Sequence, residues 1–417
     1  MLPDWEGKIS AKAFEITAFS ILGLLFVARP TTLVPTVVLL LASIAVLAHV
    51  GFRNRFYAVF TASPYMWMSC AMLVWFCVAL LLALSHQSQE KFYFPDNALR
   101  MVMATTLLAM VAKPPRSMRW LLSGMVVAGV SSAYWAIHAW PWSAVSRVQG
   151  TTNNAIHFGN LSAVIMMLSL TAALLATDIF SKLRKLLFVA ALGGFVGAIS
   201  SLSRSSFVVL LCVLPLGFLA GSGSSAKWLK RVVAVSVVVG LAVMTSSSIR
   251  DKLRVTEALV DVQHIQEGNY MSSVGARVAM WQTAWNIFKE HPIVGVGPGR
   301  FQSEIVRRIQ AGEIPNTEIY NQPHSDIMHA LSSGGLLKFF SYLGILLAPF
   351  IFFYRRYREA GDSAEGRLMP IMGMQVVGAY FLTGLTNSNF DLQIYSTTYA
   401  VLVCVLAKLS MQPESEL

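Results

Sequence analysis

Long apolar runs separated by short polar breaks recur along the whole chain. A helix needs roughly 20 mainly apolar residues to cross the ~30 Å hydrocarbon layer of a membrane. The runs therefore predict an all-α, polytopic membrane protein with about twelve spans, of which the fourth, seventh and eighth are short or interrupted. The predicted spans are centred near Gly23, Ser43, Val74, Thr106, Val130, Met166, Gly193, Leu211, Val238, Leu343, Val377 and Leu402.

Basic residues are distributed unevenly between these runs. The alternate short breaks hold mainly single cations, Arg29, Lys91, Arg147 and Arg204. Clusters follow the even-numbered runs instead, at Arg53 and Arg55, at Lys113, Arg116 and Arg119, at Lys182, Arg184 and Lys185, at Lys227, Lys230 and Arg231, and at Arg355, Arg356, Arg358 and Arg367. Because clustered Lys and Arg mark cytoplasmic loops, both termini are predicted to be cytoplasmic and the alternate breaks to face outward.

One connection, from about 246 to 333, is far longer than the others. A structureless segment of that length is unusual, and the topology places it on the outer, periplasmic side. We expect two amphipathic helices that lie on the membrane surface or cap the bundle. Their apolar positions recur at helical spacing, at Val278, Trp281, Trp285 and Phe288, and again at Phe301, Ile305 and Ile309. The predicted organisation is nine spans in 1–247, the external connection in 248–333 and three spans in 334–417.

The composition agrees with a lipid environment, because 55% of the residues are hydrophobic and 13% are charged, about half the charged share of soluble domains. The net charge of +11 does not indicate nucleic-acid binding, since the basic residues form short clusters and not one stripe. All cysteines lie inside apolar runs, so neither a disulfide framework nor a CxxC metal site is predicted. They are Cys70, Cys77, Cys212 and Cys404.

Four arginines in the outward-facing breaks are candidates for binding an anion. Arg204 lies between two apolar runs, where a lone cation is costly without a partner or ligand, although it can also reach lipid headgroups. Arg277 begins the first amphipathic segment, and its guanidinium fork suits bidentate binding of phosphate oxygens. Arg147 and Arg300 are further candidates for the same pocket, Arg300 being the weaker one.

His324, in a Gln-Pro-His-Ser-Asp sequence before the tenth span, is the best-placed group for taking up a proton near neutral pH. Nearby cations would disfavour the imidazolium, lower the pKa of this histidine and keep it neutral. The alternative is a structural histidine that caps the following helix.

Three segments together resemble the O-antigen ligase and polymerase superfamily of bacterial membrane proteins. The first is Ser203-Arg204-Ser205 at the start of a span. The second runs from Arg277-x-x-x-Trp281 through Ala284 and Ile287 to Pro292-x-x-Gly295-x-Gly297-x-Gly299-x-Phe301, and the third is Pro323-His324-Ser325 followed by Gly334-Gly335-Leu336. A looser fourth element is Arg147-x-x-Gly150-Thr151 with Asn153 and Asn154.

The resemblance implies a GT-C-like glycosyltransferase in the bacterial inner membrane. It implies a donor of undecaprenyl diphosphate carrying O-antigen, an acceptor hydroxyl on lipid A-core, and inversion at the anomeric carbon. His324 would then be the general base. Arg204 and Arg277, with Arg147, would bind the diphosphate and neutralise it as it leaves.

Acidic residues give no sign of a metal site. There is no Asp-x-Asp or HExxH sequence, and Glu304, Glu313, Glu318 and Asp326 are dispersed. We therefore expect a reaction without metal or other cofactor, in which positive side chains stabilise the leaving diphosphate.

The sequence departs from the family at one position beside the histidine. Asn often follows it in the family, whereas Ser325 stands here, so the role of that amide must fall to another group. Asp326 or Asp391 is the expected substitute, and Trp281 and Arg300 are further supporting candidates.

Other activities remain open. O-antigen polymerases and protein O-oligosaccharyltransferases use the same donor, and the absence of a large additional soluble domain favours a lipid acceptor. A lipid-linked glycan flippase is the non-enzymatic alternative. Such a transporter would place its essential charges near the bilayer midplane, whereas Arg277 and His324 are predicted to lie outside it.

Overall fold

The computed structural model describes residues 4–27, 32–61, 63–86, 94–110, 114–141, 146–175, 181–209, 270–314, 316–361 and 363–411. All regular structure in these ranges is helical. The runs predicted near Leu211 and Val238, Cys212 and the connection up to residue 269 lie outside the described residues.

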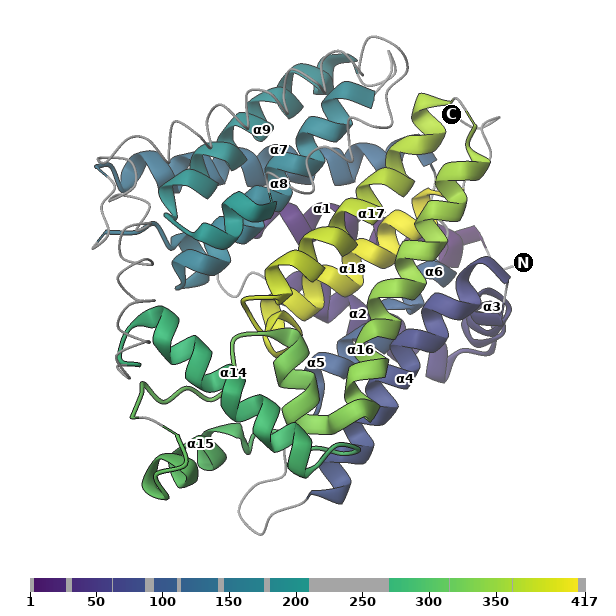
Figure 1. Ribbon diagram of the computed structural model, residues 1–417. Helices are drawn as coiled ribbons and strands as arrows, with labels where there is room; N and C mark the ends of the chain where they lie inside the picture. The colour runs from purple at the N-terminus through teal and green to yellow at the C-terminus, as the bar shows by residue number, and fades with distance from the viewer. Residues whose placement is uncertain are drawn as a thin grey trace.

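The helices form one bundle with a smaller unit at its end (Figure 1). The unit consists of α14 (Ser273–Glu290) and α15 (Phe301–Gln310). The bundle contains α1 (Asp4–Gly23), α2 (Leu33–Ala48), α3 (Val50–Thr61), α4 (Ser63–Ser85), α5 (Asp96–Ala104), α6 (Thr106–Ala109), α7 (Pro114–His138), η1 (Gly150–Thr152), α8 (Ala155–Leu175), α9 (Ser181–Ser200), α16 (Asp326–Glu359), α17 (Ala364–Gly384), η3 (Asn389–Asp391) and α18 (Gln393–Leu409).

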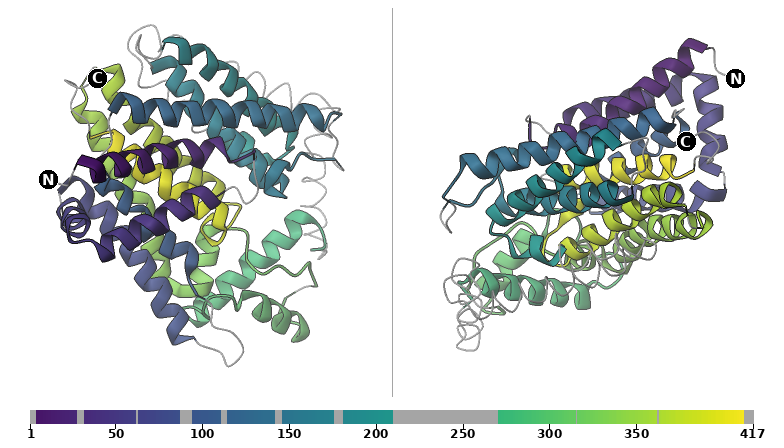
Figure 2. Two further views of the ribbon diagram at one scale, coloured as in Figure 1. Left: turned by 180° about the vertical axis from the view of Figure 1, so that it is seen from behind. Right: turned by 90° about the horizontal axis from the view of Figure 1, so that it is seen from above.

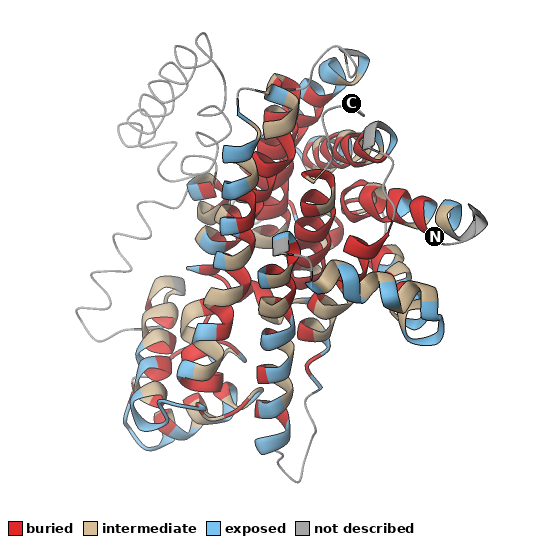
Figure 3. Ribbon diagram, turned by 90° about the vertical axis from the view of Figure 1, so that its right-hand side faces the viewer, coloured by how far each residue is buried: buried red, intermediate tan, exposed pale blue. Residues whose placement is uncertain are grey.

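Helices α8 and α18 form the centre of the bundle. In α8, 89% of the apolar window is buried by protein, and every residue of α18 from Tyr399 to Ala407 is fully buried. Figure 3 shows this buried centre surrounded by helices with exposed outer faces. Small residues permit the close packing, because a methyl group on Gly194 of α9 would lie 2.7 Å from the backbone nitrogen of Met166 in α8. α7, α8 and α9 pack against one another, and α8 also contacts α17 (Figure 2).

Among the described residues, five helices are long and apolar enough to cross a membrane, which indicates a membrane protein. They are α4, α7, α8, α9 and α16, and a sixth crossing is formed if α2 and α3, bent by 105°, make one broken span. The prediction of about twelve spans is therefore not confirmed, and two of its runs lie outside the described residues. The fourth predicted span is broken into α5 and α6 at Thr105, whose hydroxyl donates to the carbonyl of Val102.

The helix α1 lies earlier in the chain than the first predicted span. The sequence placed its centre near Gly23, but α1 ends at Gly23 and includes the charged segment before it. Within α1, Glu15 is buried, 3.4 Å from Arg116 of α7 and 3.8 Å from Lys12. A carboxylate is tolerated inside a bundle when it is paired, whereas hydropathy counts only the cost of its charge in an apolar segment.

The α14–α15 unit has its own small apolar core. Ala276, Met280, Ala284 and Ile287 of α14 pack against Phe301 and Ile305 of α15, together with Ile314. The sequence analysis predicted helices here, and it predicted the buried positions of α15 correctly. In α14 the face that packs against α15 is not the predicted Trp stripe, and Trp285 of that stripe is 46% exposed.

Helix α16 is broken at Gly335, which has φ 58° and ψ −153°. The chain from His291 to Arg300, which joins α14 to α15, docks at this break. The amide nitrogen of Leu336 donates to the carbonyl of Pro292 at 2.8 Å, and that of Leu337 donates to Ile293 at 3.2 Å. These bonds replace those that the break removes from the helix, because an unpaired buried amide is costly.

Candidate functional site

Arg147, Arg204 and Arg277 line one cavity of about 450 Å³. They come from three distant parts of the chain: the segment before η1, the start of the helical residues 204–209 after α9, and the second turn of α14. The rest of the lining is largely apolar and includes Leu202, Val208, Ile156, Leu382 and Leu385. The cavity thus combines three guanidinium groups with an apolar wall.

The turn that carries Arg204 is fixed by α8. Asn160 of α8 accepts hydrogen bonds from the hydroxyls of Ser205, at 2.7 Å, and Ser206, at 3.1 Å. The neighbouring Gly159 provides the necessary space, since a methyl group there would lie 2.5 Å from the Ser206 hydroxyl oxygen. Sequence reasoning singled out Arg204 but not these two residues of α8.

Arg147 is attached to the same turn. Its Nε donates to the carbonyl of Ser201 at 2.9 Å, and the backbone nitrogen of Val148 donates to Ser200 at 3.3 Å. The two arginines are thereby held side by side by the backbone between α9 and Arg204. Such attachment reduces the conformational entropy that each side chain would lose on binding a ligand.

Arg277 lies at the positive end of α14. Ser272 caps this helix by accepting a hydrogen bond from the Gly275 backbone nitrogen at 3.0 Å. The first turn of a helix favours negative charge because its amide dipoles add up there. Both the Arg277 guanidinium and the N-terminal end of α14 therefore attract an anion.

His324 lies beside this cavity, immediately before α16. Its φ is +50°, a conformation that side chains other than glycine rarely adopt. Trp281, one turn after Arg277 on α14, donates from Nε1 to the carbonyl of Pro323 at 2.9 Å. The Tyr320 ring lies edge-on to the imidazole, with 5.0 Å between the ring centroids. Conformations of this kind persist where the surroundings hold them, and they are frequent at functional sites.

The His324 side chain is hydrogen-bonded to Asn387, which follows α17. The Asn387 amide nitrogen donates to Asn389 at 2.8 Å, and Asn389 in turn donates to Thr383 at 2.9 Å. Asn387 therefore offers its oxygen to an imidazole N–H. This leaves the second ring nitrogen as the proton acceptor.

Burial of the imidazole, followed by the positive charge of Arg277, lowers the pKa of His324, and the hydrogen bond to Asn387 partly opposes that shift. A lowered pKa keeps the imidazole neutral at pH 7, which is the form that can accept a proton. Asn387 was missed by the sequence analysis. The sequence feature that could have identified it is the polar segment Thr-Asn-Ser-Asn, which starts at Thr386 between two apolar runs.

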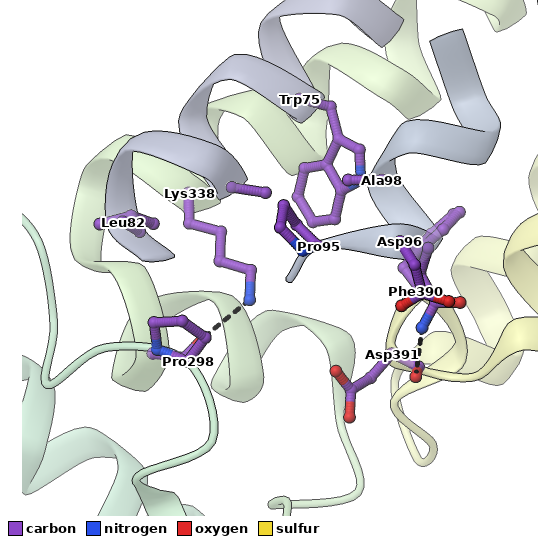
Figure 4. Close-up of a pocket in the computed structure, with 12 residues that line it drawn as sticks. Trp75, Leu82, Pro95, Asp96, Ala98, Pro298, Lys338, Phe390 and Asp391 are labelled. Carbon is purple, nitrogen blue, oxygen red and sulfur yellow. Dashed lines mark hydrogen bonds between the residues drawn. The ribbon is translucent and has the colours of Figure 1, made fainter. Parts of the chain in front are cut away.

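The two acids expected to replace the family asparagine have other partners. Asp326 is buried and accepts from the backbone nitrogen of Phe390 at 3.2 Å, which fixes the start of α16 to η3. Asp391 lies 3.6 Å from His329 of α16. Figure 4 shows Asp391 in a separate small pocket with Lys338 and Pro298.

Arg300 does not line the cavity of the other three arginines. It donates to the backbone carbonyl of His86, at the end of α4, at 2.7 Å and lines a second cavity. His157, in the first turn of α8, was not singled out by sequence but lies within electrostatic range of His324. Its ring contacts Tyr395 edge-on at 5.3 Å.

Comparisons with known proteins give one family match and one similar protein. Residues 186–343 match the family model described as O-antigen ligase. The matched segment includes Arg204, Arg277 and His324, and excludes Arg147 and Asn387. The chain is also similar to an uncharacterized protein from Haemophilus influenzae, with 23% identity over 150 residues. That alignment covers 36% of this chain and 37% of the relative.

Proposed function

We propose that this protein is an O-antigen ligase of the bacterial inner membrane. It transfers a glycan from undecaprenyl diphosphate to a sugar hydroxyl of lipid A-core on the periplasmic side, with inversion and without a metal. The observation that carries the proposal is the cavity in which Arg147, Arg204 and Arg277 meet beside His324.

In the proposed reaction, His324 takes the proton of the acceptor hydroxyl. The hydroxyl oxygen forms the new bond to the anomeric carbon, and the bond from that carbon to the diphosphate oxygen breaks. The electron pair leaves with the diphosphate. The three arginines neutralise the charge that develops on it, in the manner of an oxyanion-binding site.

The apolar wall of the cavity suits the lipid part of the donor. Leu382 and Leu385, at the end of α17, line the cavity together with Thr386 and Val208. A polyprenyl chain attached to a diphosphate needs a cationic site that continues into an apolar surface. Both features occur here within one cavity.

The proposal is tested by glycan transfer from purified undecaprenyl diphosphate donor to lipid A-core in detergent, with EDTA present. Wild type should form the product, and His324→Ala should reduce the rate by about 10²- to 10⁴-fold. His138→Ala is the matched control, since His138 is exposed at the end of α7.

The products decide between related activities. Elongation of the donor's own glycan without transfer to lipid A-core would assign the chain as a polymerase, and transfer to a protein acceptor would assign it as a protein O-oligosaccharyltransferase. Loss of transfer on chelation would contradict the metal-free mechanism.

A further inference from the structure

The chain that joins α14 to α15 begins with an exposed apolar segment. Pro292, Ile293 and Val294 are all exposed, and 67% of the Ile293 surface is accessible. The glycines that follow, Gly295 and Gly297, are buried. The first part of this loop therefore presents neighbouring apolar side chains outward, and such a patch marks a surface that contacts something other than water.

The contacts of this segment with α16 give its depth. Helix α14 runs toward the adjoining ends of α4 and α16 (Figure 1). Ile293 lies against the break in α16, because a methyl group on Gly335 would be 2.4 Å from its carbonyl carbon. A methyl group on the neighbouring Gly334 would be 2.6 Å from a side-chain carbon of Leu82 in α4. Ile293 and Leu82 therefore lie at similar heights along α16.

This height lies within the apolar span of α4. The span runs from Pro64 to Ser85, and at ~1.5 Å per residue Leu82 is about 4.5 Å inside its end. Leu81 and Leu84, on either side of Leu82, are exposed. Apolar side chains that the protein leaves exposed on a membrane-spanning helix contact lipid. The hydrocarbon layer therefore extends to the height of Ile293.

The exposed loop residues continue the outer face of α16. Leu336 and Phe340, one turn apart on this membrane-spanning helix, are both exposed. The Leu336 amide donates to the carbonyl of Pro292 at 2.8 Å, and the next amide of α16 donates to the carbonyl of Ile293 at 3.2 Å. The loop is thus bonded to α16 directly beside a face that contacts lipid.

The loop backbone is suited to this depth. Irregular backbone is tolerated within the hydrocarbon layer only where its polar groups are paired inside the protein. The carbonyls of Pro292 and Ile293 accept the two bonds from α16, and the Val296 amide donates to the carbonyl of Ser332 at 3.0 Å. Proline has no amide hydrogen that would need a partner.

We propose that this loop is a membrane anchor, in which Ile293 and Val294 insert among the lipid acyl chains of the leaflet next to the α14–α15 unit. The anchor follows the last residue of α14, and the bond from Trp281 to Pro323 holds the same helix nearer its start. The unit is thereby kept at a fixed height relative to the bilayer, together with Arg277. The inference does not depend on the proposed reaction, because lipid contact is measured without substrate.

The test is power-saturation EPR on the full-length protein in phosphatidylcholine nanodiscs. The native cysteines are replaced by alanine, and a spin label is attached through Ile293→Cys. The label should collide more with oxygen, which concentrates among acyl chains, than with a water-soluble nickel chelate, as should a label at Phe340→Cys. Lys289→Cys is the matched control, because Lys289 is an exposed, charged position four residues earlier, and its label should favour the nickel chelate.

A label at residue 293 that favours the nickel chelate as strongly as the one at residue 289 would overturn the inference. A label shielded from both reagents would overturn it as well, since a second copy of the chain would then cover Ile293. A second variant needs no label. Ile293→Asn should increase protease cleavage within α14 and α15 in nanodiscs by about tenfold relative to Ile293→Leu, because the apolar burial of this side chain is lost. Equal cleavage of the two variants would show that Ile293 does not hold the unit at the bilayer.

Discussion

The helix bundle and the α14–α15 unit are held together by different interactions. The bundle is stabilised by close packing around α8 and α18, with small residues where helices meet. The α14–α15 unit has a small apolar core and a set of ion pairs around Arg308. It is attached to the bundle by backbone hydrogen bonds at the broken α16 and by the bond from Trp281 to Pro323.

The difference matters because the proposed site lies at the junction. Arg147 and Arg204 belong to the bundle, Arg277 belongs to the attached unit, and His324 is held from both sides, by Asn387 and by the loop that Trp281 fixes. The bundle therefore provides a fixed half of the site. The geometry of the other half depends on how firmly the unit is attached.

The strongest test of this dependence is Gly335→Ala. The backbone angles of Gly335 are accessible essentially to glycine alone, and a methyl group there would lie 2.5 Å from the carbonyl oxygen of Pro292. We expect a loss of stability of about 3 kcal/mol together with loss of transfer activity, because the loop can no longer dock. Thermal denaturation in detergent measures the first and the transfer assay the second.

Gly361→Ala is the matched control for that change. Gly361 also has a positive φ, 55°, but a methyl group there would have open space around it. The substitution should cost only the backbone strain, about 1 kcal/mol, and leave transfer intact. If both variants lose activity to the same extent, docking at Gly335 is not what positions the site.

A smaller effect is expected when the α14–α15 unit itself is weakened. Arg308 is 2% exposed and contacts Glu290, Glu304 and Glu313, whereas Arg307 shares two of these partners from an exposed position. Arg308→Met would remove the ion pair of Glu290 and leave Glu304 and Glu313 with Arg307 alone. Since the three carboxylates are partly exposed and remain hydrated, we expect a cost of about 2 kcal/mol, below that of a fully buried pair.

The readout for Arg308→Met is limited proteolysis, with increased cleavage in α14 and α15 and little change in the bundle. Arg307→Met, the matched control, should change the pattern little, because exposed ion pairs contribute little to stability. Uniform cleavage of the whole chain would show that the two regions unfold as one.

The sequence predicted best those features that depend on a single type of residue. Apolar runs identified α4, α7, α8, α9 and α16, and the arginines that meet in one cavity were identified singly because cations are rare in outward-facing breaks. It failed where a residue's environment depends on a partner that is distant in sequence. Glu15 is tolerated in α1 because of Arg116, a contact that hydropathy cannot represent.

The surroundings of His324 could not be predicted for the same reason. Asn387 and His324 are brought together by the packing of α17 against α16, and nothing in the local sequence specifies that pairing. The glycines from Gly295 to Gly299 were visible as a motif. These glycines lie in the loop that docks onto the break at Gly335. That role could not be predicted, because the sequence does not show that α16 is interrupted.

The smallest expected effect concerns the pH dependence of the reaction. His324 must be neutral to act as the base, so kcat/KM for the donor, which reports the free enzyme, should rise with pH through the pKa of His324 and then level off. Burial and Arg277 lower this pKa, which places the midpoint of the acid limb below the ordinary histidine value of about 6.5.

Asn387→Ala makes this prediction specific to the site. The hydrogen bond from Asn387 stabilises the protonated imidazole and raises the pKa of His324, so its removal should move the acid limb to lower pH than in wild type. The maximal rate should fall as well, because the imidazole loses the group that orients it. A merely structural role of Asn387 would reduce the rate without moving the limb. A limb that moves to higher pH would contradict the assignment of His324 as the titrating base.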